Sequence, residues 1–477
     1  MARYYKYKSP EDVVDDATRL GHSLHISNDF SSLFQPVEIG SRTVGNRLCV
    51  QPMEGCDGTL DGHPDELTVR RYQRFGAGGA KLLWGEATAV TDAARMNARQ
   101  LLINEQTASS IENMLEGCRT AHRKEFGDDT DLLVGLQLAH SGRFSFRKPL
   151  VVTHDPILDP LTLDKSTGKF LDDSYPLLTD DDLKRIEDEY VEAAKRIHKI
   201  GFDFIDIKQC HRYLLSELLA AKNRPGPYGG SLENRSRLVR NAILRIRNEV
   251  PELIIATRMN AYDGIPYRGV GEDLIGEPRP HELPLQCAFG TDENDHTRED
   301  LDEPIQLAQW LREWGVQLIN ISAGNPYANP HVVRPAEYPP VDGYHAPEHP
   351  LLGVLRHFRL ASAIQQAVPD VPVIGSGYSW LQDFAMHAAA ANISKGAVSL
   401  VGMGRATLSH PDFAKCLQET GKMNRKQICR TFSYCTNLMR SKNHPLGQYP
   451  TGCPPFDKEV YGPIWNEAKL KRNDQQD

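Results

Sequence analysis

The feature that most constrains the fold is a series of eight apolar, strand-like segments along most of the chain. Each segment is followed by small or polar residues, and helical patterns lie between most of them. Six of the eight have nearly continuous apolar cores, as expected for parallel strands that are buried on both faces. The segments occupy residues 46–53, 80–90, 132–142, 202–208, 253–260, 316–324, 371–377 and 397–405.

Eight strands that alternate with helices predict an α/β fold of the (β/α)8 barrel type, a TIM barrel. An open, doubly wound sheet gives the same alternation and is the alternative. The clearest helical pattern covers residues 178–201, where Thr179 and Asp182 resemble a capping box and Gly201 marks the end. A second helix is expected from about residue 231 to residue 250.

Three segments do not fit the repeat of the barrel domain, which we place at residues 33–423. Residues 1–32 form an N-terminal extension, and residues 424–477 form a tail that contains three cysteines. Residues 264–302 are an insertion after the fifth strand, on the face of the barrel where active sites lie. We expect this insertion to cover or shape a substrate site, and a solvated surface loop is the alternative.

Composition excludes several classes of function. The net charge is −8, which argues against a general nucleic-acid surface because phosphate binding needs clustered basic residues. No apolar run approaches the roughly 18 residues of a membrane span, and the N-terminus lacks the apolar segment of a signal peptide. Nine thinly spread cysteines fit a reducing compartment. We therefore expect a cytoplasmic protein that acts on a small molecule, without nucleic-acid or membrane partners.

Glycines and one arginine follow the last two predicted strands. The seventh ends in Gly375-Ser376-Gly377 and the eighth in Gly402-Met403-Gly404-Arg405. Barrel enzymes often bind phosphate with these two loops, because glycine lets backbone N–H groups approach the oxygens and arginine grips them with two hydrogen bonds. The sequence thus predicts a phosphate site, with simple tight turns as the alternative.

The other strand ends carry polar side chains that would meet on the same face of a barrel. Gln137 offers a donor and an acceptor, as the amide edge of a heterocycle requires, and Arg258 offers a fixed cation. The full set is Glu54, Gln137, His140, Lys208, His211, Tyr213 and Arg258.

Four motifs, in consistent order between residues 33 and 415, resemble the old yellow enzyme family of FMN-containing NADH:flavin oxidoreductases. The resemblance is strongest to the branch with 2,4-dienoyl-CoA reductase and trimethylamine dehydrogenase. The motifs are "LFQPVEIGSRTVGNRLCVQPM" (33–53), "LQLAHSGR" (136–143), "GFDFIDIKQCHRYLLSELLAAKNRPGPYGGSLENRSR" (201–237) and "LVGMGRATLSHPDF" (400–413).

The resemblance implies FMN across the barrel mouth, with NAD(P)H as the electron donor. Met53 and Ala87 would line the flavin ring, Gln137 would hold its pyrimidine edge, and Arg258 would lie beside N1 and O2. Glu54 stands near the ring, where the family often has Thr or Cys. The phosphate would be held by Gly375, Gly377, Gly404 and Arg405.

The resemblance also assigns catalytic roles to the third motif. Tyr213 matches the proton-donating tyrosine of the family. Lys208 and His211 match a pair, commonly two His or His and Asn, that binds the electron-withdrawing group of the substrate. The implied reaction is hydride transfer to the β-carbon of an activated alkene, with charge stabilised by Lys208 and His211 and a proton supplied by Tyr213.

Two site residues depart from the family pattern. Lys208 suggests an anionic substrate, or it pairs with Asp206, two positions earlier on the same strand face. Glu54 has four interpretations. It is a charged carboxylate that lowers the reduction potential of the flavin, a protonated hydrogen-bond donor with a pKa raised by burial, a ligand for a cationic substrate, or a side chain turned away toward a basic group.

The tail is a third departure, because the resembled branch binds an iron–sulfur cluster there with four cysteines. Here Cys429, Cys435 and Cys453 remain, and Phe432 stands where another cysteine is expected. We predict unligated thiols and assign no metal, with zinc bound by these three and His444 as the alternative. No nucleotide-binding domain is expected after the barrel, so electrons would come from NAD(P)H docking at the FMN or from a separate partner protein. The resemblance also allows a homo-oligomer.

The leading hypothesis is an NAD(P)H-dependent flavoenzyme that reduces an activated C=C bond. The first alternative is an oxidative flavoenzyme, such as an amine N-demethylase or dehydrogenase, since Glu54 suits a cationic amine. The second is a non-redox aldolase that uses Lys208 as a Schiff-base amine. That alternative leaves Gln137, Arg258 and Tyr213 without a role.

Overall fold

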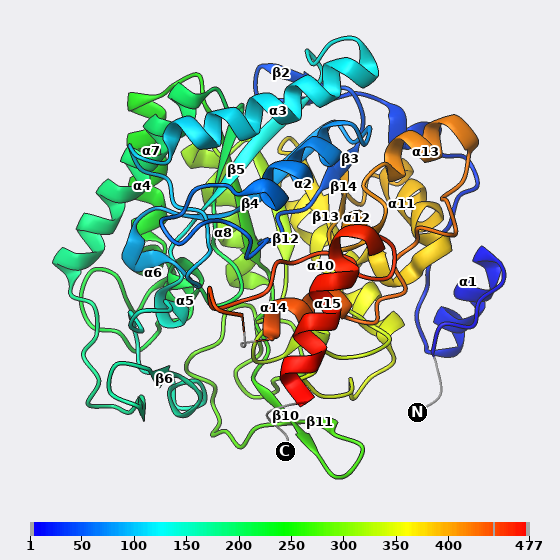
Figure 1. Cartoon of the computed structure of the whole chain (residues 1–477). Helices are drawn as coiled ribbons and strands as arrows, with labels where there is room; N and C mark the ends of the chain where they lie inside the picture. The colour runs from blue at the N-terminus through cyan, green and yellow to red at the C-terminus, as the bar shows by residue number, and fades with distance from the viewer. Residues whose placement is uncertain (1–3, 442–443, 474–477) are drawn as a thin grey trace.

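Eight parallel strands close into a barrel at the centre of the computed structural model, which describes residues 4–441 and 444–473 (Figure 1). Strands that follow one another in sequence are neighbours in space, and the last pairs with the first. The barrel prediction is confirmed, and each strand lies within its predicted segment. The strands are β3 (Leu48–Val50), β4 (Leu82–Ala89), β5 (Leu133–Ala139), β8 (Phe204–Ile207), β9 (Ile254–Asn260), β12 (Leu318–Ser322), β13 (Val373–Gly375) and β14 (Leu400–Met403).

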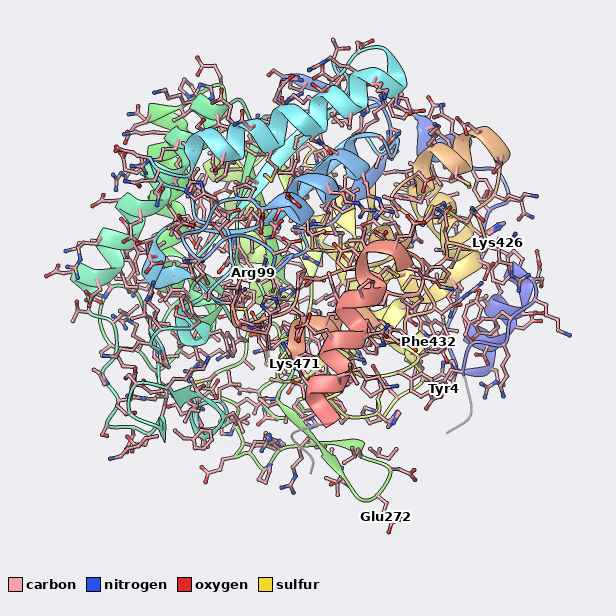
Figure 2. The ribbon with its side chains drawn as sticks, viewed as in Figure 1. Tyr4, Arg99, Glu272, Lys426, Phe432 and Lys471 are labelled. Atoms are coloured by element: carbon pink, nitrogen blue, oxygen red, sulfur yellow. The ribbon has the colours of Figure 1, made fainter. Side chains whose placement is uncertain are left out.

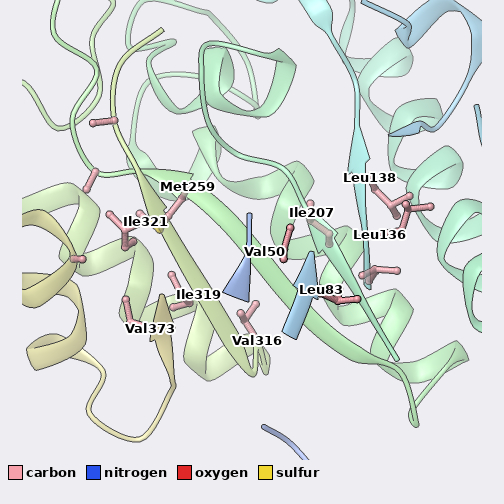
Figure 3. Close-up of a cluster of buried hydrophobic side chains, with 14 of the residues drawn as sticks. Val50, Leu83, Leu136, Leu138, Ile207, Met259, Val316, Ile319, Ile321 and Val373 are labelled. Carbon is pink, nitrogen blue, oxygen red and sulfur yellow. The ribbon is translucent and has the colours of Figure 1, made fainter. Parts of the chain in front are cut away.

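Alternate residues of these strands form two apolar layers, because successive side chains of a strand point to opposite faces. One layer fills the barrel with side chains that include Trp84, Phe204 and Leu318. The hairpin of β1 (Val37–Ile39) and β2 (Arg42–Val44) contributes Ile39 and Val44 to this layer. The other layer packs between the strands and the helices, and Figure 3 shows part of it. Burial on both faces explains the nearly continuous apolar runs.

The larger helices surround the barrel (Figure 1). The predicted helix at 178–201 is α4 (Asp180–Ile200), which begins with the Thr179–Asp182 capping box and ends at left-handed Gly201. The predicted helix at 231–250 is divided at Ser236 into α6 (Leu232–Arg235) and α7 (Arg237–Glu249). The others are α2 (Glu66–Gly76), α3 (Ala108–Phe126), α5 (Leu214–Leu219), α8 (Asp302–Trp314), α9 (Pro330–Val333), α10 (Pro350–Ala367), α11 (Ala385–Ser394), α12 (Ala406–Ser409) and α13 (Phe413–Thr420).

Both terminal segments pack against the barrel domain. The N-terminal extension carries α1 (Pro10–Arg19), and the backbone N–H of Tyr5 donates to the Glu337 carboxylate at 2.9 Å. The tail forms α14 (Tyr434–Arg440) and α15 (Lys458–Asn473). Just before α15, Asp457 forms ion pairs with Arg70 and Arg74 of α2, at 2.8 and 2.6 Å.

The insertion after β9 begins with a hairpin, β10 (Tyr267–Val270) and β11 (Ile275–Pro278), which projects from the body with Glu272 at its tip (Figure 2). The insertion is joined to the loop after β12, where Tyr267 N–H donates to the Ala328 carbonyl at 2.8 Å. Within residues 4–441 and 444–473, no helix combines the length and apolar character needed to cross a bilayer.

Candidate active site

A pocket of about 190 Å³ lies at the ends of the barrel strands and brings together most of the predicted site residues. Among the residues predicted to bind FMN or to act in catalysis, Gly375 is the exception, since it is the last residue of β13 and is not part of the pocket lining. The lining includes the predicted residues Met53, Glu54, Ala87, Gln137, Lys208, His211, Tyr213, Arg258, Gly377, Gly404 and Arg405.

Three arginines line this pocket without an acidic partner. Among the described residues, Arg258, Arg334 and Arg405 form no ion pair with a carboxylate. Arg405 donates to the Thr436 hydroxyl at 2.8 Å, and Arg258 Nε has no hydrogen-bond partner. Burial, together with the charge of Arg334, lowers the pKa of Arg405 to about 9. Desolvated guanidinium groups without counter-ions favour an anionic ligand rich in acceptor oxygens. The phosphate and the electron-rich pyrimidine edge of FMN fit this requirement.

A buried carboxylate fixes the orientation of Gln137. Gln137 Nε2 donates to Asp206 Oδ2 at 2.5 Å, and Asp206 also accepts from Trp84 Nε1 and the Arg258 backbone N–H, both at 2.7 Å. Because an ionised carboxylate only accepts, the amide oxygen of Gln137 is left for a ligand. The Asp206 carboxylate thus accepts hydrogen bonds from these three donors. The proposed ion pair between Asp206 and Lys208 is wrong, since Lys208 makes none within 4 Å in the part of the chain that the structure describes.

The three candidate catalytic residues lie together in the turn that follows β8. The Lys208 amine lies 3.5 Å from the centroid of the Tyr213 ring. His211 Nε2 is hydrogen-bonded to Ser322 Oγ at 2.8 Å, and the Tyr213 hydroxyl to the Tyr327 hydroxyl at 3.2 Å. Burial lowers the pKa of Lys208 and of His211 and raises the pKa of Tyr213. His211 is therefore neutral and Tyr213 protonated near neutral pH, as a hydrogen-bond partner and a proton donor require.

Glu54 lines the pocket and accepts a hydrogen bond from Asn97 Nδ2. The interpretation in which it turns away to pair with a basic group is wrong, because no ion pair of Glu54 is found among the described residues. Desolvation, with a smaller contribution from the charge of Glu86, raises its pKa to about 7, and the charge of Lys208 opposes this rise. Glu54 can therefore be either protonated or charged near neutral pH.

One of the grouped polar residues lies elsewhere. His140 is buried outside the pocket lining, and its Nδ1 accepts from the Gly142 backbone N–H at 3.2 Å. Burial lowers the pKa of His140 to about 3, so it stays neutral. It directly follows β5 but is the one member of the set that does not line the pocket, and a hydrogen bond within the next turn holds its ring.

Sequence reasoning missed part of the lining. Tyr327 and Arg334 come from the loop after β12, and Thr436 and Met439 come from α14 in the tail. The first two had a usable signal, since loops that follow barrel strands build the active face. The tail residues had no such signal, because their place depends on how α14 packs.

The tail cysteines are free thiols, with Cys435 and Cys453 buried and Cys429 partly exposed. Among the described residues, no group of three or more His, Cys, Asp or Glu is arranged to hold a metal ion. His444 instead packs its ring edge-on against Tyr449, with centroids 4.8 Å apart. The zinc alternative therefore finds no set of ligands.

Comparisons with known proteins agree with this arrangement. The sequence model of the NADH:flavin oxidoreductase / NADH oxidase family matches residues 32–275. An NADPH dehydrogenase of Halalkalibacterium halodurans is 27% identical over 68% of this chain and 80% of its own length. An NADH oxidase of Thermoanaerobacter brockii is 25% identical over 84% of this chain, which spans 52% of that relative.

Solved structures share the fold at lower identity. Morphinone reductase in complex with tetrahydroNAD has a TM-score of 0.57 at 19% identity, covering 83% of this chain and 92% of its own. A 2-naphthoyl-CoA reductase complex has a TM-score of 0.66 at 14% identity, covering 92% of this chain and 58% of its own. At these identities the likeness establishes the barrel fold alone.

Proposed function

Because this chain belongs to the NADH:flavin oxidoreductase / NADH oxidase family, with FMN as cofactor and NAD(P)H as electron donor, we propose that it reduces activated C=C bonds in α,β-unsaturated compounds. The observation that carries the proposal is the cluster around Tyr213. A cation, a neutral imidazole and a second tyrosine surround this phenol within the pocket that holds the three unpaired arginines.

The cofactor would be held mainly by the three arginines that form no ion pair with a carboxylate among the described residues. Arg405 and Arg334 would bind the FMN phosphate together with the backbone at Gly377 and Gly404. Arg258 and the free amide oxygen of Gln137 would hold the pyrimidine part of the ring system. Met53, Ala87 and Glu54 line the same pocket and would contact the ring.

When bound, reduced FMN would supply the hydride, and the side chains of this chain would bind the substrate and provide the proton. Lys208 and His211 would donate hydrogen bonds to the electron-withdrawing group, stabilising the negative charge that develops on its oxygen. Tyr213 would deliver a proton to the α-carbon, and its hydrogen bond to Tyr327 gives a path for replacing that proton. The reductant NAD(P)H would dock directly at this pocket, so a separate electron-transfer partner is not required.

One observation favours the oxidative alternative, in which an amine is the electron source. Glu54 lines the pocket without an ion pair, and a carboxylate of this kind suits a cationic amine. The charge of Lys208 in the same lining opposes it. The Schiff-base aldolase is set aside, since the family is one of oxidoreductases and the three arginines would have no role.

The direction of the reaction is tested with the purified holoenzyme under anaerobic conditions. NADPH and NADH are each added while the visible flavin absorbance is followed, and an enone such as 2-cyclohexenone is added after bleaching. We expect one nucleotide to bleach the flavin and the enone to restore its absorbance. Bleaching by trimethylamine, with no reoxidation by any enone or enoate, would favour the oxidative reaction and overturn the proposal.

A further inference from the structure

A second and larger cavity lies next to the pocket of about 190 Å³ described above, which we call the flavin pocket, and beneath the insertion that follows β9. This chamber, as we call it, has a volume of about 550 Å³, and its walls come from residues 155–158, 263–266 and 280–288, with Arg212, Asn325, Ala328 and Asn329. Its size falls within the roughly 300–1,000 Å³ of typical small-molecule sites. None of its lining residues belongs to the lining of the flavin pocket.

Two short segments supply residues to both cavities and so form a shared wall. In the turn after β8, His211 and Tyr213 line the flavin pocket, whereas Arg212 between them lines the chamber. His211 and Arg212 have positive φ values of 66° and 61°, an uncommon backbone for such residues, often found at functional sites. In the loop after β12, Asn325 lines the chamber and Tyr327 lines the pocket.

The charges of the chamber disfavour an anionic ligand. Arg212 forms ion pairs with Asp155 at 2.7 Å and with Asp263 at 3.5 Å, and it also donates to the Cys287 carbonyl. Two carboxylates against one guanidinium leave no spare positive charge for a phosphate or a carboxylate. The exposed Glu282 at the edge adds a further negative group.

The unpartnered N–H donors of the chamber favour a ligand that carries a hydrogen-bond acceptor. Arg212 Nε and Asn325 Nδ2 have no partner among the described residues, and both atoms are themselves buried, so a ligand oxygen reaches them only when these side chains turn toward the chamber. A buried donor without an acceptor is costly, and a ligand carbonyl oxygen would satisfy it. Much of the remaining lining is apolar, including Ile157, Leu158, Ile265, Leu285 and Ala288.

We propose that the chamber is a second ligand site, which binds a neutral and mainly apolar carbonyl compound through Arg212 and Asn325. The ligand is either a separate small molecule or the distal part of an extended substrate, and the carbonyl chemistry is the same for both. A ligand in the chamber contacts the shared wall. Its binding therefore changes the rate of the reaction in the flavin pocket, where Tyr213 and Tyr327 lie.

The probe is 4-phenyl-2-butanone, a neutral ketone with an apolar ring and no reducible alkene. Calorimetric titration of the holoenzyme measures its binding without turnover, so the result does not depend on the direction of the redox reaction. We expect two molecules per chain, one in each cavity. Ile157→Trp fills the chamber and should abolish one binding event, while Leu244→Trp, on the exposed side of α7, should leave both.

Arg212→Lys is the second variant and does not fill the chamber. It keeps a cation between Asp155 and Asp263 but removes the Nε donor, so we expect chamber affinity to fall about three- to tenfold. Inhibition of the reduction of 4-phenyl-3-buten-2-one identifies the source of the ligand. If the saturated ketone inhibits partly in a noncompetitive way and Ile157→Trp removes that part, the chamber binds a separate molecule. If the inhibition is competitive and Ile157→Trp relieves it, the chamber binds the distal part of the substrate.

Two results would overturn the proposal. One is a single binding event that neither Ile157→Trp nor Arg212→Lys alters. The other is the absence of binding up to about 10 mM ketone, because a site weaker than this would provide less than about 3 kcal/mol.

Discussion

The two cavities at the mouth of the barrel use arginine in opposite ways. In the flavin pocket, Arg258, Arg334 and Arg405 have no carboxylate partner within the described part of the chain, whereas in the chamber Arg212 has two. An arginine in a cavity therefore indicates an anionic ligand only when it has no carboxylate partner within the protein. The presence of arginine alone does not indicate the charge of the ligand. The pocket is built for an anionic cofactor, and the chamber for a neutral molecule.

The largest effect on the reaction rate is expected when the proton donor of the flavin pocket is removed and the chamber is left unchanged. Tyr213→Phe should lower the rate of alkene reduction about 10²- to 10⁴-fold, because the proton donor is lost. Bleaching of the flavin by NAD(P)H should stay close to the wild-type rate. Stopped-flow measurement of the two half-reactions separates these effects, with Tyr175→Phe as the control. Equal loss in both half-reactions would contradict a role in proton transfer.

Arginine substitutions compare the two cavities directly. Arg405→Met should weaken FMN binding about 10- to 100-fold, because charge-assisted hydrogen bonds to the phosphate are lost. Arg212→Met should instead lower the free energy of unfolding by about 3 kcal/mol or more, because two buried carboxylates lose their counter-ion. Flavin fluorescence and denaturant unfolding measure these quantities.

The comparison would fail if the two arginine variants behaved alike. Arg359→Met, which removes a half-exposed ion pair with Glu299, serves as the control and should change neither quantity appreciably.

A smaller effect is expected at Lys208. Lys208→Met keeps the length of the side chain and removes its charge, so kcat/KM for an enone should fall about tenfold while FMN stays bound. Lys222→Met, in the loop after α5, is the matched control. Unchanged kinetics for both neutral enones and anionic enoates would exclude a role for Lys208 in polarising the substrate.

The smallest effect concerns Glu54 and the dependence of stability on pH. The pKa of Glu54 is raised to about 7 in the folded protein and is 4.5 in the unfolded chain. Between these values the unfolded chain ionises Glu54 and the folded protein does not, so its contribution falls as pH rises from about 4.5 to 7. Glu54→Gln removes this dependence.

Relative to wild type, we therefore expect Glu54→Gln to gain about 1–2 kcal/mol of stability between pH 5 and pH 6.5, measured by urea unfolding of the apoprotein. A constant difference across this range would show that Glu54 does not titrate there. Glu313→Gln, on the exposed face of α8, provides the baseline.

Much of the fold was determined by local sequence patterns. The eight apolar segments, the Thr179–Asp182 capping box and the terminal Gly201 depend on periodicity and on nearby hydrogen bonds, which sequence records directly. The polar residues at strand ends were also predictable, because closing a parallel barrel brings all these ends to one face. That rule placed most of the flavin pocket.

The partners of those residues were decided only by the tertiary structure. Asp206 binds Gln137 and Trp84 instead of Lys208, and His140 accepts a hydrogen bond within the turn that follows it and does not line the pocket. Arg334 and α14 reach the pocket from distant parts of the chain, and the chamber forms where the insertion meets the segments that follow β5, β8 and β12. Side-chain pairing and cavities depend on packing between segments far apart in sequence, and a local pattern carries no record of that packing.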